Sequence, residues 1–188
     1  RDWHWALGPT VDVVGVTPPG RNTRLNERPL DNMPDLQQVL LPLVQEELRL
    51  PTILMGYSIG ALVAYELALR LADAGTPASA LITAASLPPQ IPRRIAARLL
   101  DDDGFLDYLI SPEVVNSPEL VQFLLPMLRA DITLGETYSP DNRPLDIPIA
   151  CINGLRDQHV NAQGIARWQE LTSQWHGSHW IDGRHFFL

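Results

Sequence analysis

The sequence predicts a single α/β domain over residues 1–188, with a mostly parallel sheet and helices on both of its faces. Short β-rich runs alternate with helical patterns, and turns rich in proline and glycine separate them. The runs are apolar without strict alternation, as in strands that are buried on both faces of a parallel sheet. A chain of 188 residues is long enough for one such domain with a sizeable core.

The first part of the chain predicts a strand, a helix and a second strand. Residues 11–16 are rich in valine and end at a turn over residues 18–20. Residues 32–48 place apolar side chains at helical spacing, and we expect a bend at Pro42. The short apolar run 52–55 predicts the next strand.

The pentapeptide Gly56-Tyr57-Ser58-Ile59-Gly60 follows that strand directly. The next residues, 61–74, predict a helix that glycine and proline close, and residues 80–84 predict a further strand. Gly-x-Ser-x-Gly between a strand and a helix is typical of a nucleophile elbow, in which a strained turn exposes the serine hydroxyl. We expect the two glycines to be required because a Cβ at either one would collide with the packed strand and helix.

The middle of the chain, residues 92–140, has helical patterns only. A helical insertion between the strands of a sheet is typical of a lid over an active site, and a helix buried in the main core is the alternative. The apolar residues of the insertion are candidates for an acyl pocket, although core packing explains the same stripe; they are Leu120, Phe123, Leu124, Met127 and Leu128.

The sheet then resumes, with strands predicted over residues 147–152 and 179–181 and a helix over 165–175 between them. A serine nucleophile requires a base, and the base requires an orienting acid, each in a loop at the carboxyl end of a strand. Asp157 follows the first of these strands and His185 the second, in the expected order of acid and then histidine.

Other residues compete weakly for these roles. The alternative acids are Asp131, Asp146 and Asp182, and the other histidines are His4, His159, His176 and His179. For the oxyanion hole we expect the backbone N–H of Ile59 as one donor, and no second donor is identifiable.

Composition excludes several classes of partner. The net charge is −8, all basic residues are arginines, and no basic run is present, which argues against nucleic acid and anionic membranes. No apolar run approaches the length of a membrane span. The single cysteine, Cys151, excludes an internal disulfide and favours a reducing compartment, so we expect a cytoplasmic protein. Acidic residues lack the spacing of a calcium loop, and no metal site is expected.

Several stretches of the chain match the pattern of one family in order. They include Pro19-Gly20-Arg21, the pentapeptide around Ser58, Pro118-Glu119-Leu120, Leu125-Pro126-Met127-Leu128-Arg129-Ala130-Asp131, Glu136-Thr137-Tyr138 and Gly183-Arg184-His185-Phe186-Phe187. With them the chain resembles the type II thioesterases, the stand-alone editing thioesterases of nonribosomal peptide and polyketide assembly lines. The resemblance spans nearly the whole chain, and the block within the insertion is rather specific to the family.

The resemblance implies an α/β-hydrolase fold with a helical lid, and it implies Ser58, Asp157 and His185 as nucleophile, acid and base. It also implies the reaction: hydrolysis of small acyl groups from the phosphopantetheine arm of acyl or peptidyl carrier proteins, which removes aberrant or stalled intermediates. The arm belongs to the substrate, so no cofactor is expected. Tyr57 replaces the histidine that usually precedes the nucleophile, and we expect Tyr57 in the pocket wall.

Against the family pattern, the chain is expected to lack an N-terminal strand with its oxyanion loop and a C-terminal helix. Two other functions remain open from the residues alone. One is a generic serine carboxylesterase or lipase that uses the same three residues on oxygen esters, because fold and substrate are separable. The other is a non-catalytic, hydrolase-like binding module.

Overall fold

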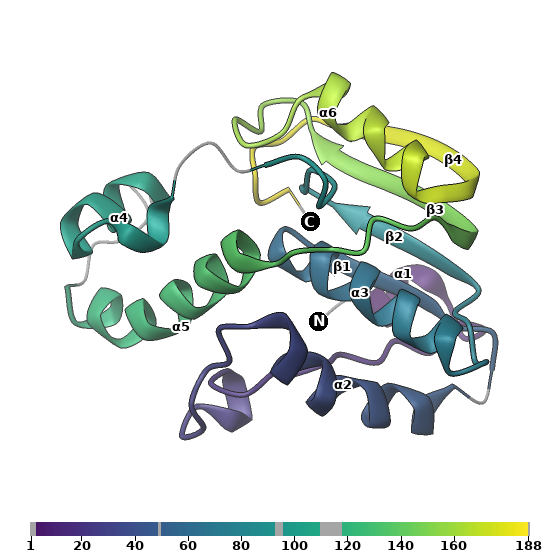
Figure 1. Ribbon diagram of the computed structural model, residues 1–188, viewed down its shortest axis with the longest axis horizontal. Helices are drawn as coiled ribbons and strands as arrows, with labels where there is room; N and C mark the ends of the chain where they lie inside the picture. The colour runs from purple at the N-terminus through teal and green to yellow at the C-terminus, as the bar shows by residue number, and fades with distance from the viewer. Residues whose placement is uncertain (1–2, 49, 93–95, 110–117, 188) are drawn as a thin grey trace.

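The computed structural model describes residues 3–48, 50–92, 96–109 and 118–187. Its sheet has four strands in the order β1-β2-β3-β4, and every neighbouring pair is parallel (Figure 1). The strands are β1 (Ile53–Tyr57), β2 (Ala80–Ala84), β3 (Leu145–Gly154) and β4 (Thr172–Ile181). The register of β1 on β2 runs from Ile53 opposite Ala80 to Tyr57 opposite Ala84. The predicted parallel α/β sheet is confirmed.

Residues 11–16, predicted as a strand, are not a strand in the structure. Their valines are exposed, Val14 by 59%, and β1 is hydrogen-bonded to β2 alone among the described strands. A valine-rich run forms a strand only where a neighbouring strand supplies hydrogen bonds and packing. The prediction from composition was therefore wrong here, and β1 is an edge strand.

The last strand begins earlier than the sequence predicts. The helix expected over residues 165–175 is replaced by α6 (Ala162–Ala166) and the 3₁₀ helix η3 (Arg167–Leu171). β4 starts at Thr172, which pairs with Leu145 of β3. Trp168, Leu171 and Trp175 suit a helical period, but pairing with β3 takes Trp175 into the sheet opposite Ile149.

The helices before and after β1 match their predictions closely. α2 (Met33–Glu47) contains Pro42 and is capped at its start by Asn32, whose side chain accepts a hydrogen bond from the N–H of Asp35 at 3.0 Å. α3 (Ile59–Asp73) follows β1 with only Ser58 between them. Two short elements precede α2, namely α1 (Trp3–Leu7) and the 3₁₀ helix η1 (Asn22–Arg24).

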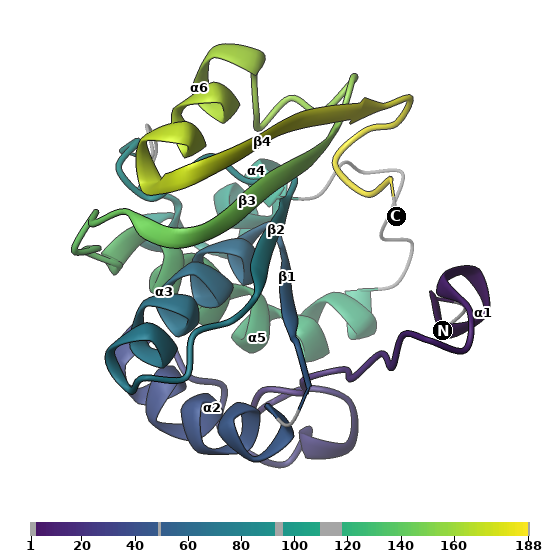
Figure 2. The same ribbon diagram turned by 90° about the vertical axis from the view of Figure 1, so that its right-hand side faces the viewer.

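The main core lies on one face of the sheet. There α3 and η3 meet, with the rings of Tyr65 and Trp168 edge to face at 5.8 Å between centroids. Figure 2 shows α3 and α6 on the same side of the strands. On the other face the strand residues are partly exposed, Ile53 by 58%, and no helix of the described ranges packs there. The sequence predicts helices on both faces of the sheet, and within the described ranges helices cover one of them.

The helical insertion has a small core of its own. It comprises the 3₁₀ helix η2 (Ala97–Leu99), α4 (Asp102–Leu109) and α5 (Pro118–Thr137). Ala97, Phe105 and Ile132 form a separate buried cluster, and the guanidinium of Arg129 stacks over the Phe105 ring at 4.4 Å. Residues 93–95 and 110–117 of the predicted lid lie outside the described residues.

The carboxyl end of α5 fastens this insertion to the main domain. Leu134 packs with Leu62 of α3, and the hydroxyl of Tyr138 donates to the carboxylate of Glu66 at 2.8 Å. Figure 1 shows α4 and the start of α5 extending away from the sheet. That arrangement fits a lid, which stays a prediction.

Within the described ranges no helix is both long and apolar enough to cross a bilayer.

Candidate active site

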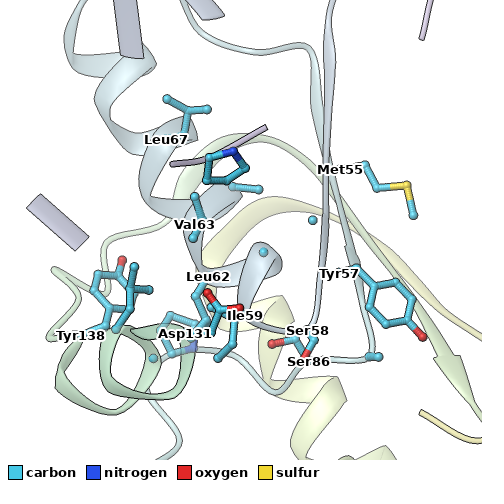
Figure 3. Close-up of a pocket in the computed structure, with 18 of the residues that line it drawn as sticks. Met55, Tyr57, Ser58, Ile59, Leu62, Val63, Leu67, Ser86, Asp131 and Tyr138 are labelled. Carbon is cyan, nitrogen blue, oxygen red and sulfur yellow. The ribbon is translucent and has the colours of Figure 1, made fainter. Parts of the chain in front are cut away.

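Ser58 occupies a strained turn between β1 and α3. Its φ is 53° and its ψ is −120°, a backbone conformation that costs a non-glycine residue about 1–3 kcal/mol. The N–H of Ser58 donates to the carbonyl of Ala84 at 2.8 Å, which ties the turn to the end of β2. The hydroxyl makes no capping bond to α3, so it is available to another side chain. Figure 3 shows Ser58 and Ile59 where β1 gives way to α3.

The two glycines of the elbow are not equivalent. A Cβ on Gly56 would lie 2.1 Å from the carbonyl oxygen of Gly60 and 2.6 Å from the Cα of Ala61, so Gly56 allows the strand and the helix to pack closely. A Cβ on Gly60 would meet nothing within 4 Å. The expected collision is thus confirmed at Gly56 and wrong at Gly60, because Gly60 faces open space.

This difference predicts opposite outcomes for two alanine variants. Gly56→Ala should lower the free energy of unfolding by about 3 kcal/mol or more, because backbone atoms must move. Gly60→Ala should leave it unchanged or raise it by up to about 1 kcal/mol, because alanine is the better helix former. Denaturant unfolding of both variants measures the difference, and equal losses would refute the close packing at Gly56.

The structure brings Ser58, His185 and Asp157 together. Nε2 of His185 lies 3.1 Å from Oγ of Ser58, and Nδ1 lies 2.8 Å from Oδ2 of Asp157. The Asp157 side chain is 0% exposed, and its second oxygen accepts the backbone N–H of His159 at 2.8 Å. Both carboxylate oxygens are therefore fixed, and His185 is held with one nitrogen toward the serine. This arrangement can move the hydroxyl proton of Ser58 to His185.

The three residues come from loops at the carboxyl ends of β1, β3 and β4, as the sequence predicts. The loop after β4 runs over the end of β3 at Gly154, where a Cβ would lie 2.3 Å from the carbonyl oxygen of Arg184. Two bonds of 2.8 Å fix the crossing: the N–H of Leu155 donates to Ile181, and the N–H of Arg156 donates to Gly183. The sequence did not predict the close approach at Gly154, because Asn-Gly after a strand indicates only a turn. It did not predict the hydrogen bond from the His159 N–H to Asp157 either.

The alternative acids are engaged elsewhere. Asp182 pairs with Arg156 at 3.0 Å on the surface, and Asp146 accepts a hydrogen bond from Ser173 at 2.6 Å. That bond, with a second from Gln174, lowers the pKa of Asp146. Asp131 of α5 pairs with Arg21.

Asp131 nevertheless lies close to the elbow, as Figure 3 shows. Burial raises the pKa of its carboxyl, and the partner guanidinium of Arg21 offsets only part of that effect. The pair links the insertion to the loop after residues 11–16.

Of the other histidines, His176 and His179 lie in β4 and His4 lies in α1.

A cavity of about 2940 Å³ begins at Ser58 and His185 and continues along β1 to residues 10–18. Three of the predicted pocket residues of α5 line it at helical spacing, namely Leu120, Leu124 and Leu128, and Tyr57 lines it from β1. Phe123 and Met127 are not part of its wall, because they lie on a neighbouring ridge of the helix. The prediction of those two as pocket residues is not supported.

The first backbone N–H groups of a helix have no partner within it, and Ile59 is the first residue of α3. Its N–H therefore suits an oxygen that gains negative charge beside Ser58. Among the described residues, no contact identifies a second donor.

Known proteins match this chain over nearly all of its length. A family model described as a thioesterase domain matches residues 1–188. The gramicidin S biosynthesis protein GrsT of Aneurinibacillus migulanus is 31% identical over 196 residues, covering 100% of this chain and 76% of GrsT. RedJ, a thioesterase from the prodiginine pathway of Streptomyces coelicolor, is similar with a TM-score of 0.88 and 30% identity, covering 99% of this chain and 76% of RedJ.

A second solved structure has the same likeness. YbtT, a type II thioesterase from the yersiniabactin pathway, has a TM-score of 0.81 and 30% identity, covering 91% of this chain and 73% of YbtT. YbtT has also been solved as a serine-to-alanine mutant.

Proposed function

The chain belongs to the thioesterase family, and we propose that it hydrolyses acyl groups from the phosphopantetheine arm of carrier proteins. In this proposal it removes aberrant or stalled intermediates beside a nonribosomal peptide or polyketide synthase. The observation that carries the proposal is the hydrogen-bonded series Ser58–His185–Asp157, at 3.1 and 2.8 Å, within a chain of this family.

In the first step Ser58 takes the acyl group. Nε2 of His185 accepts the proton of the Ser58 hydroxyl as Oγ forms a bond to the acyl carbonyl carbon. The carbonyl oxygen becomes negative and accepts the N–H of Ile59. The carbon–sulfur bond then breaks, the thiol leaves with the proton from His185, and an acyl ester on Ser58 remains.

In the second step water removes the acyl group. His185 accepts a proton from a water molecule, whose oxygen attacks the ester carbonyl. The ester bond breaks, Oγ of Ser58 recovers the proton from His185, and the free acid leaves. Asp157 holds the imidazole in one tautomer throughout and stabilises its positive charge. The cycle consumes one thioester and one water and uses no cofactor.

The pocket and the partner follow from the same proposal. One wall of the cavity is apolar and suits an acyl chain; it is formed by Leu120, Leu124 and Leu128 of α5. Polar groups of a substrate would find no hydrogen-bond partner on these side chains. GrsT, RedJ and YbtT are described as proteins of biosynthetic pathways, and this supports an acyl or peptidyl carrier protein as the partner.

The proposal is tested by comparing two rates of hydrolysis. One substrate carries an acyl group as a thioester on a carrier protein, and the other carries the same acyl group in a simple oxygen ester. We expect kcat/KM to be at least about tenfold higher for the carrier thioester, equal to about 1.4 kcal/mol in the transition state. A clear preference for the oxygen ester would make the chain a carboxylesterase. No hydrolysis of either substrate by the folded protein would make it a binding module.

A further inference from the structure

The hydroxyl of Tyr57 is bound to the chain segment that carries His185. It donates a hydrogen bond to the carbonyl of His185 and accepts one from the N–H of Phe187 at 3.2 Å. The hydroxyl thus donates one hydrogen bond and accepts another, both with backbone groups on either side of Phe186. Tyr57 lines the cavity as the sequence predicts, but its hydroxyl is bonded to the backbone.

The topology of the sheet explains why this segment requires an anchor. β1 and β4 are the two edges of the sheet, so His185 must reach Ser58 across the ends of β3 and β2. Close passage over Gly154 and the bond from Arg156 to Gly183 fix the first part of the crossing. Beyond Gly183, Tyr57 supplies hydrogen bonds to the backbone at the far edge.

Ring contacts reinforce the same attachment. The Tyr57 ring packs edge to face on His185 at 6.0 Å between centroids, stacks on Phe186 at 6.4 Å and contacts Phe187 at 5.5 Å. Figure 3 shows the ring on the side of β1 away from Leu62 and Val63, which belong to α3. A tyrosine hydroxyl is protonated at neutral pH, and burial raises the pKa of Tyr57 further, so the hydroxyl remains a donor.

We propose that Tyr57 is a positioning residue, whose hydroxyl holds the backbone of His185 and thereby keeps the imidazole within hydrogen-bonding distance of Ser58. Because Tyr57 directly precedes Ser58, one rigid strand end sets the place of both the nucleophile and the base. A tyrosine at this position thus acts through His185 rather than on the acyl group. The inference rests on the proposed roles of Ser58 and His185.

Tyr57→Phe tests the proposal, because it removes the hydroxyl and keeps the ring. We expect kcat to fall about 10- to 100-fold with KM within about twofold, since a displaced base slows the chemistry and leaves the acyl pocket intact. The matched control is Tyr65→Phe, which removes a hydroxyl that donates to the carbonyl of Arg143 at 2.8 Å, in the buried core. It should lower the free energy of unfolding and leave kcat within about twofold.

A second measurement needs no substrate. The proton in the hydrogen bond between His185 and Asp157 should give a downfield proton NMR signal, which we expect to shift or broaden in Tyr57→Phe and to stay unchanged in Tyr65→Phe. This result separates the positioning role from the choice of thioester as substrate. A wild-type kcat together with an unmoved signal in Tyr57→Phe would overturn the proposal. Equal losses of kcat in the two variants would also overturn it, because a general loss of stability would then explain them.

Discussion

Ser58→Ala is expected to lower kcat for thioester hydrolysis by about 10⁴-fold or more, with a small effect on KM. The variant removes the oxygen that bonds to the acyl carbon, and His185 then has no hydroxyl to activate. In the proposed function the acyl chain binds against the cavity wall of α5, which this change does not touch. Steady-state kinetics on an acyl carrier protein measure both constants.

Ser86→Ala is the matched control for this change. Ser86 is a second serine near the elbow (Figure 3). It is buried, and its hydroxyl donates to the carbonyl of Leu87 at 3.2 Å, whereas the hydroxyl of Ser58 is the one within hydrogen-bonding distance of His185. We expect its kcat to stay within a few-fold of the wild type. Undiminished hydrolysis by folded Ser58→Ala would remove Ser58 from the mechanism.

Asp157→Asn is expected to lower kcat by about 10⁴-fold, the second large effect. The side-chain carbonyl of asparagine can keep the hydrogen bond from the N–H of His159, which places the amide NH₂ against Nδ1 of His185. An NH₂ donor there favours the tautomer with the proton on Nε2. In that tautomer His185 cannot accept the proton of Ser58.

Asp182→Asn supplies the comparison, because Asp182 is another carboxylate in the loop of His185. Its pair with Arg156 lies on the surface, where such pairs contribute at most about 1 kcal/mol. We expect an unchanged kcat for this variant, measured on the same substrate. A large loss in Asp182→Asn together with a normal rate in Asp157→Asn would transfer the orienting role to Asp182.

The sequence predicts the site better than it predicts the sheet around it. Ser58, Asp157 and His185 could be found because each follows a strand, and the carboxyl ends of parallel strands share one edge of a sheet. Their order along the chain then assigned the acid and the histidine. The apolar wall of α5 was found in part, since a stripe of leucines predicts a buried face without saying which ridge faces the cavity.

The features that sequence reasoning missed depend on partners that are distant in the chain. Residues 11–16 have strand composition but no strand beside them, and Thr172 joins β4 because β3 pairs with it. Gly60 repeats the pattern of Gly56, yet only Gly56 packs against backbone. The bond between Tyr57 and His185 joins residues 128 positions apart, and no local pattern signals it.

The central claim is that Ser58 carries the acyl group between the two steps. The most direct test mixes the protein with an acyl carrier thioester, stops the reaction by rapid quench and measures peptide masses. We expect an early mass increase equal to one acyl group on the peptide that contains Ser58, and its loss as the free acid forms. Cys151 is the internal comparison: it is buried, and burial raises the pKa of its thiol to about 12, so it should stay unmodified. Release of the acid with no acyl group on Ser58 at any time, or with the group on another residue, would contradict the account.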